Sequence, residues 1–169
     1  TICSGSFDET IRIWDIETAK QMNVFNGHRS YVKSVKYGPN ELRNIILSGS
    51  LDKSVRLWDI RSGQQIQLFD RHKNDVTCVE YSPFVIKNSS EVIDGNSNVI
   101  CSGSDDKTIR FWDIRSNKNE LYVINTNKKV LCLKFIELKK RLNNNEKKSN
   151  GNSCVNLCYG SRNVICVWG

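Results

Sequence analysis

A short motif that occurs three times in the chain constrains its fold more than any other feature. The copies are SGSFDETIRIWDI at Ser4–Ile16, SGSLDKSVRLWDI at Ser48–Ile60 and SGSDDKTIRFWDI at Ser102–Ile114. From Trp14 to Trp58 the spacing is 44 residues, within the period of about 40–45 residues typical of repeats that each form four strands. The next spacings, to Trp112 and Trp168, are 54 and 56 residues, and polar insertions at Lys87–Asn98 and Lys139–Asn152 account for the excess. The chain is therefore built from repeated units.

Within one period the sequence reads as four short strands rich in Val, Ile, Tyr and Trp. These strands are Tyr31–Tyr37, Asn44–Ser50, Ser54–Ile60 and Gln64–Phe69, with turn-forming residues between them. The same order recurs later, whereas the first unit lacks a first strand and the last unit lacks a fourth. We predict an all-β chain with a partial unit at 1–26, complete units at 27–70 and 71–125, and a degenerate partial unit at 126–169. The third unit has an insertion at 87–98, and the fourth has a basic, Asn- and Lys-rich insertion at 137–152.

The pattern S-G-S-x-D-x-x-[IV]-R-x-W-D resembles the repeat of WD-repeat (WD40) proteins, and the resemblance covers nearly the whole chain. It implies an incomplete arc of a β-propeller made of four-stranded antiparallel blades, two complete and two partial. The chain opens on a strand-like segment at Thr1, so we expect residues to precede it and the remaining blades of a longer chain to complete the propeller.

The resemblance also implies that a His, a Ser, an Asp and a Trp in each repeat are linked by hydrogen bonds. The two complete sets are His28, Ser48, Asp52 and Trp58, and His72, Ser102, Asp106 and Trp112. Such a chain of polar groups can be buried because each donor meets an acceptor. In the last unit Tyr159-Gly-Ser-Arg-Asn163 replaces S-G-S-x-D, so we expect that unit to depend mainly on apolar packing.

A Ser, a His and an Asp together also suggest a hydrolase, but the repetition of the set argues against catalysis. A fold-stabilising network must recur in every module, whereas a catalytic centre needs one exposed nucleophile. The sequence contains no Gly-rich phosphate loop and no H-E-x-x-H motif. Cys154 and Cys158 have no second pair to complete a zinc site. We predict a protein without catalytic residues, metal or cofactor.

Composition limits the compartment and the partners. The seven cysteines include no C-x-x-C pair, and unpaired strand cysteines favour a reducing compartment, the cytoplasm or the nucleus. No apolar run is long enough for a membrane-spanning helix. Of the net charge of +7, most comes from residues 139–148. That segment lacks aromatic residues, which favours a solvated loop over a nucleic-acid patch, although contact of Glu137–Asn152 with RNA or an acidic partner stays open.

We expect protein partners to bind at one rim of the blades. By the family geometry, this rim carries the turn between the second and third strands and the connection between blades. The predicted rim residues are Phe7, Tyr31, Lys33, Leu51, Asp75, Thr77 and Asp105. Exposed aromatic side chains with apolar neighbours are typical of binding hot spots. The alternative is that Phe7 and Leu51 fold back over adjacent blades. Asp105 would repel phosphate, and only Arg162 would attract it.

The leading interpretation is a non-enzymatic scaffold for protein–protein interactions in a multiprotein complex. One alternative is the substrate receptor of a cullin-type ubiquitin ligase, because Trp-Asp-x-Arg ends the third strand at Arg61 and Arg115. Another is a regulatory propeller of a larger protein that also has a catalytic or nucleotide-binding domain.

Overall fold

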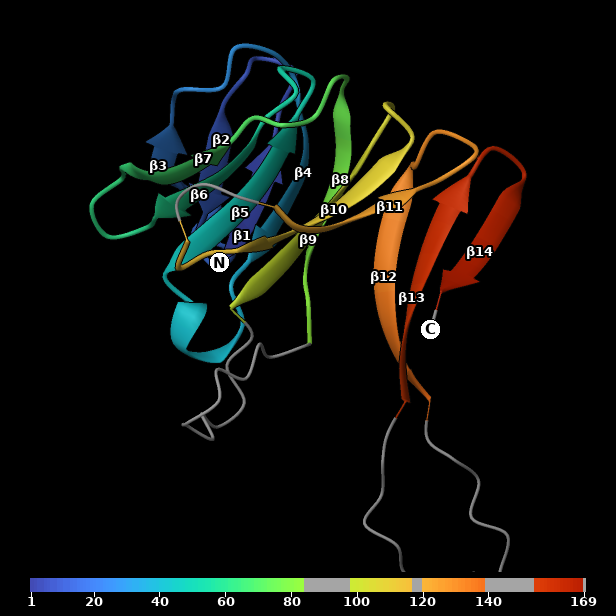
Figure 1. The fold of residues 1–169 in the computed structure, drawn as a ribbon. Helices are drawn as coiled ribbons and strands as arrows, with labels where there is room; N and C mark the ends of the chain where they lie inside the picture. Colours follow the sequence, from blue (N-terminus) through green and yellow to red (C-terminus); the bar gives the residue numbers. More distant parts are fainter. Residues whose placement is uncertain (84–97, 117–119, 139–153, 169) are drawn as a thin grey trace, which may run out of the picture.

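The computed structural model describes residues 1–83, 98–116, 120–138 and 154–168 (Figure 1). These residues form four antiparallel sheets and one short 3-10 helix. The insertions predicted at 87–98 and 137–152 lie almost entirely outside the described residues. In the parts of the chain that are described, no helix has the length and apolar character needed to cross a membrane.

The strands follow one another in chain order within each sheet. The first sheet contains β1 (Ile2–Gly5), β2 (Ile11–Trp14) and β3 (Gln21–Phe25). The second contains β4 (Val32–Tyr37), β5 (Ile45–Ser50), β6 (Val55–Asp59) and β7 (Gln65–Phe69), with the helix η1 (Asn40–Leu42) between β4 and β5. The third contains β8 (Val76–Tyr81), β9 (Val99–Ser104), β10 (Thr108–Asp113) and β11 (Glu120–Asn125). The fourth contains β12 (Cys132–Leu138), β13 (Cys154–Ser161) and β14 (Val164–Trp168).

The sheets converge along their first strands. Strand β8 lies against both β4 and β12, and the carboxylate of Glu80 in β8 forms ion pairs with two lysines of those strands. Glu80 Oε2 is 3.1 Å from Lys36 Nζ and 3.5 Å from Lys134 Nζ. The prediction of an incomplete arc with two complete and two partial blades is confirmed. The first sheet has no counterpart of β4, and the fourth has none of β7, among the described residues.

Each pair of neighbouring sheets encloses an apolar core. Alternate residues of a strand point to opposite faces, so the second sheet packs Ile46 and Trp58 against the first sheet and Val55 and Leu57 against the third. Trp58 is 1% exposed. Every sheet therefore belongs to two cores, apart from those at the ends of the arc.

The glycine of each S-G-S motif faces a valine that follows it in the next unit, at very short distance. A Cβ atom added to Gly5 or Gly49 would be 2.7 Å from Cγ1 of Val32 or Val76, and one added to Gly103 would be 2.5 Å from Cγ1 of Val130. Atoms cannot approach this closely without repulsion, so these positions have no room for a side chain. The glycines set how closely one sheet approaches the next.

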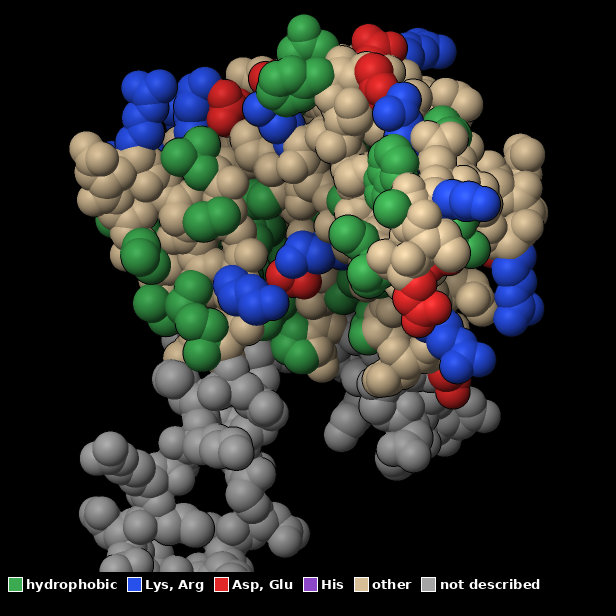
Figure 2. Space-filling view, turned by 180° about the vertical axis from the view of Figure 1, so that it is seen from behind, with side chains coloured by type: hydrophobic (Ala, Val, Ile, Leu, Met, Phe, Trp, Pro, Cys, Tyr) green, Lys and Arg blue, Asp and Glu red, His purple; other side chains and the backbone are tan. Residues whose placement is uncertain are grey.

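The fourth sheet presents an apolar face that no other described sheet covers. Ile165 is 80% exposed and Val167 is 64% exposed. By strand pairing they correspond to Ile109 and Phe111 of the third sheet, which are buried. Figure 2 shows hydrophobic side chains gathered over this end of the molecule, on the left of that view. The fourth sheet thus repeats the apolar face that the first three sheets bury.

Candidate functional site

The second sheet links the side chains of its His, Ser, Asp and Trp in one hydrogen-bonded chain. His28 lies before β4, Ser48 in β5, Asp52 in the turn that follows and Trp58 in β6. His28 Nδ1 is 2.8 Å from Asp52 Oδ2, and His28 Nε2 is 2.8 Å from Ser48 Oγ. The indole N–H of Trp58 donates to the same Ser48 Oγ at 2.8 Å. A proton on Nδ1 lets His28 donate to the carboxylate while Nε2 accepts from the hydroxyl, so each group has a partner.

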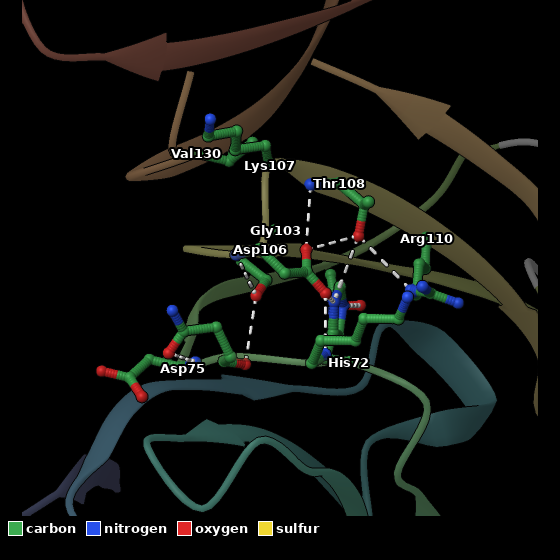
Figure 3. Close-up of polar contacts among 12 residues, drawn as sticks. His72, Asp75, Gly103, Asp106, Lys107, Thr108, Arg110 and Val130 are labelled. Carbon is green, nitrogen blue, oxygen red and sulfur yellow. Dashed lines mark hydrogen bonds and ion pairs between the residues drawn. The ribbon is translucent and has the colours of Figure 1, made fainter. Parts of the chain in front are cut away.

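The third sheet repeats this arrangement, and Figure 3 shows its His72 and Asp106. His72 Nδ1 is 2.8 Å from Asp106 Oδ2, and His72 Nε2 is 2.7 Å from Ser102 Oγ. Trp112 donates its indole N–H to Ser102 Oγ at 2.9 Å. Ser48 and Ser102 are 0% exposed, so neither hydroxyl can reach a substrate in solution.

In each complete sheet, two further side chains extend the hydrogen-bonded chain, and the sequence analysis did not identify either of them. The Ser54 hydroxyl donates to Asp52 Oδ1 at 2.5 Å, and Arg56 Nε donates to Ser54 Oγ at 3.1 Å. In the third sheet Thr108 donates to Asp106 at 2.6 Å, and Arg110 donates to Thr108 at 3.3 Å. The guanidinium then reaches the fourth strand, at Gln65 in one sheet and Glu120 in the next. The [ST]-[IV]-R part of the motif was the available signal.

The first sheet holds a shorter version of this hydrogen-bonded chain, and the turn of the fourth sheet lacks the Asp. In the first sheet Trp14 donates to Ser4 Oγ at 2.9 Å, and Arg12 pairs with Asp8 at 2.6 Å. In the fourth sheet Ser161 pairs with Val164. The turn there contains only two residues, Arg162 and Asn163, and neither is an Asp.

Burial and hydrogen bonding shift the pKa of these groups. Burial alone would raise the pKa of Asp106, but hydrogen bonds from Thr108, from the backbone N–H of Lys73 and from His72 lower it to about 2. The same balance, with His28 and Ser54 as donors, holds the pKa of Asp52 well below its ordinary value. Burial lowers the pKa of His72, although its contact with Asp106 acts in the opposite direction. The carboxylates are therefore charged and His72 neutral at pH 7.

These shifts predict two stages of acid destabilisation. An unfolded chain protonates histidine near pH 6.5, whereas the lowered pKa of His72 keeps the folded imidazole neutral. Stability therefore falls as the pH drops below about 6.5. The stabilisation from Asp106 is present above its unfolded pKa of about 3.9 and is lost as the pH falls toward about 2.

Thermal melts followed by circular dichroism should show the midpoint falling between pH 7 and 5, then falling again below pH 4. The His72→Gln variant removes one titrating group, so its melting temperature should change less between pH 7 and 5. A wild-type melting temperature that is constant from pH 7 to pH 5 contradicts the first stage.

The structure places no metal-binding cluster in the described ranges, where no three or more His, Cys, Asp or Glu side chains are grouped suitably. Two cysteines lie in the core between the third and fourth sheets. Burial raises the pKa of the Cys78 thiol to about 12 and raises that of Cys101 well above its ordinary value. Both thiols therefore stay protonated, which makes them poor nucleophiles and poor metal ligands.

The turns between second and third strands and the connections between sheets all lie at the upper edge in Figure 1. We call this edge the upper rim; it comprises residues 6–9, 26–33, 51–53, 70–77, 105–107, 126–131 and 162–163. At its junction between the first two sheets, Phe7 stacks on Tyr31 with ring centroids 4.6 Å apart and planes 18° apart. Lys33 Nζ lies 5.1 Å from the centroid of the Phe7 ring. Phe7 is 65% and Tyr31 43% exposed.

The other predicted rim residues lie at later junctions. Leu51 and Asp75 are half-buried, and the Leu51 N–H donates to Tyr31 O at 3.0 Å. Asp105 forms an ion pair with Lys129 of the connection to the fourth sheet. Thr77 donates its hydroxyl to Val130 O at 2.6 Å, so its side chain joins two sheets. The structure thus brings only Phe7, Tyr31 and Lys33 together as one exposed cluster.

Arg61 and Arg115 follow the third strands of the two complete sheets and differ in their contacts. The Arg115 guanidinium makes two hydrogen bonds of 3.0 Å to the carboxylate of Asp113. The Arg61 side chain is exposed, and its backbone N–H donates to Asp59 Oδ1 at 3.2 Å. Of the two guanidinium groups, that of Arg61 is the one without an ion-pair partner in the described part of the chain.

Converging antiparallel sheets with a buried Trp–Ser–His–Asp chain in successive modules define a β-propeller repeat protein. Comparison with protein families agrees with this class. The family described as "WD domain, G-beta repeat" matches residues 1–15, 19–59 and 63–113. The chain belongs to the WD40 repeat family.

Two curated relatives are WD-repeat proteins. The chain is 48% identical to "WD40 repeat-containing protein HOS15" of Arabidopsis thaliana over 40 residues. This matched region covers 24% of this chain and 6% of that protein. The chain is also 32% identical to "WD repeat-containing protein pop2" of Schizosaccharomyces pombe over 124 residues. That matched region covers 73% of this chain and 12% of that protein. The matched regions thus span a small part of each relative.

Proposed function

We propose that this chain is a non-enzymatic scaffold segment that binds partner proteins at its upper rim. The observation that carries the proposal is the exposed stack of Phe7 on Tyr31. Members of the WD40 family typically bind other proteins, and large aromatic side chains contribute most of the energy in many protein interfaces. The buried free thiols of Cys78 and Cys101 support a reducing compartment, the cytoplasm or nucleus.

The stack is held in a fixed geometry before any partner arrives. The Val32 N–H donates to Ser6 O at 3.0 Å, which ties the connection carrying Tyr31 to the turn carrying Phe7. Phe7 does lean over the neighbouring sheet, as the fold-back alternative requires, yet most of its surface stays open. Pre-organised aromatic rings lose little conformational entropy on binding, which favours affinity.

A ubiquitin-ligase substrate receptor is the second candidate, and the contacts favour it less. Arg115 is already paired with Asp113, so binding an adaptor through that guanidinium would require breaking the pair. Of the two guanidinium groups, that of Arg61 has no ion-pair partner among the described residues and needs no such pair to be broken.

Affinity purification from cells tests the rim proposal. In the double variant Phe7→Ala/Tyr31→Ala, we expect recovery of specific partners, measured by quantitative mass spectrometry, to fall about tenfold or more. The control is Ile66→Ala, which removes an exposed apolar side chain, 52% exposed, from the outer strand β7. Equal recovery by wild type and both variants would overturn the proposal.

A further inference from the structure

The three junctions of the upper rim have the same backbone positions but different side chains. At each junction we compare the residue before the turn Asp with the residue before the valine that contacts the S-G-S glycine. These pairs are Phe7 with Tyr31, Leu51 with Asp75, and Asp105 with Lys129. The two side chains contact each other at the first and third junctions. The last pair is an ion pair and neutralises itself. The first pair alone presents an exposed aromatic surface.

The charge around the aromatic pair is unbalanced. Lys33, Arg29 and Lys53 belong to the rim of the second sheet and have no ion-pair partner among the described residues. Two rim carboxylates beside them are already bonded inside their own sheets: Asp8 with Arg12, and Asp52 with His28. Glu9, which lies in the same turn as Phe7, also has no ion-pair partner among the described residues. Three unpaired cations therefore outnumber one unpaired carboxylate beside the apolar surface.

Lys33 is the cation closest to that surface. Its ammonium group lies over the Phe7 ring, whereas the equivalent Thr77 of the next sheet uses its side chain to bond Val130 O. A carboxylate that approaches the stack would meet the Lys33 ammonium at the edge of the apolar patch. Electrostatic complementarity of this kind mainly determines which partner is accepted.

Resting on the proposed function, we infer that the cluster of Phe7, Tyr31 and Lys33 binds an extended segment of a partner protein that carries one apolar anchor with one acidic residue beside it. The segment places an aromatic or large apolar side chain against the Phe7–Tyr31 stack and an adjacent Asp or Glu carboxylate on Lys33. Asp75 at the next junction has no ion-pair partner among the described residues. It disfavours a long run of acids, so a single acidic residue beside the anchor fits best.

Binding to an array of surface-bound hexapeptides tests this inference. The peptides have a central Phe or Gly flanked by Asp, Gly or Lys, and the probe is the fluorescently labelled protein. We expect Asp-flanked Phe peptides to bind at least about tenfold more strongly than Lys-flanked Phe peptides or any peptide with a central Gly. Phe7→Ala should abolish this signal, and Lys33→Glu should reverse the preference toward Lys-flanked peptides.

The matched control is Lys107→Glu, which makes the same charge change on the same rim at another sheet. Glu9 already occupies the equivalent turn position, with φ of 71° against 66° for Lys107, so the backbone accepts Glu there. This variant should keep the wild-type preference. Absence of a Phe-dependent signal, equal binding of Asp- and Lys-flanked peptides, or an unchanged preference in Lys33→Glu overturns the inference. If partner recovery from cells still depends on Phe7 and Tyr31 in those cases, the scaffold proposal stands and only the partner chemistry is wrong.

Discussion

Replacing Trp58 with alanine is expected to lower the free energy of unfolding by about 3–5 kcal/mol. The indole is buried between the first two sheets, with its ring centroid 5.9 Å from that of Phe25. It also donates the hydrogen bond that Ser48 accepts. The substitution would therefore create a cavity and remove the donor to a hydroxyl that water cannot reach.

Trp14 provides the matched control because it holds the same motif position in the first sheet. It is half-buried and bonded to Ser4 at 2.9 Å, but no described sheet packs on its outer side. Trp14→Ala should therefore cost clearly less than Trp58→Ala in urea unfolding followed by circular dichroism. Equal losses for the two variants would mean that enclosure between sheets is not what makes Trp58 stabilising.

The second large effect is expected from Gly49→Ala, with a loss of about 1–3 kcal/mol. The new methyl group would lie 2.7 Å from Val76 Cγ1 and 2.9 Å from Val79 Cγ1. Both valines are almost fully buried and belong to the next sheet, so the two sheets must separate to relieve the contact. Chemical denaturation measures the loss directly.

Gly160→Ala is the control for this substitution. Gly160 holds the equivalent position in the fourth sheet, where the added methyl group meets only the Sγ atom of the exposed Cys132. We expect a smaller loss there. In addition, the double variant Gly49→Ala/Val76→Ala should be more stable than the sum of the two single losses predicts. Strict additivity in this cycle would contradict a direct Gly49–Val76 contact.

The sequence predicted the repeated architecture because the information for it is local. Alternating apolar residues and turn residues define each strand, and the predicted strand Gln64–Phe69 differs from β7 by one residue. The family and the all-β arc are confirmed. The residues expected to share hydrogen bonds, such as His28 and Ser48, do lie within bonding distance, while their contribution to stability remains a prediction.

Contacts between sheets were not predictable because they depend on the angle between blades. Asn23 donates its amide to Ile60 O at 3.1 Å, and Gln67 donates to Ser116 O at 2.9 Å. Each joins a fourth strand to the end of the third strand in the next sheet. At the third junction Tyr122 occupies this position and packs on Trp168, with centroids 6.1 Å apart. Nothing in the strand pattern distinguishes these residues from ordinary surface polar residues.

The rim was predictable in outline only. The sequence identified Phe7 and Tyr31 as rim positions, but their stacking requires the first sheet to lean on the second. Asp105 was expected to repel phosphate as a free carboxylate, whereas the structure pairs it with Lys129. Pairing across a junction, rather than residue type alone, determines which rim charges remain available to a partner.

The glycine–valine contact also bears on how such a chain can change over evolutionary time. Strand β8 pairs with β9 as β4 pairs with β5, with the same register shift after the first valine. The connection from Tyr81 to Val99 is nevertheless longer than that from Tyr37 to Ile45. The spacing of neighbouring sheets is set inside the sheets, so the length of these connections is free to drift. The length of the connection between first and second strands and partner choice at the upper rim can then be selected separately.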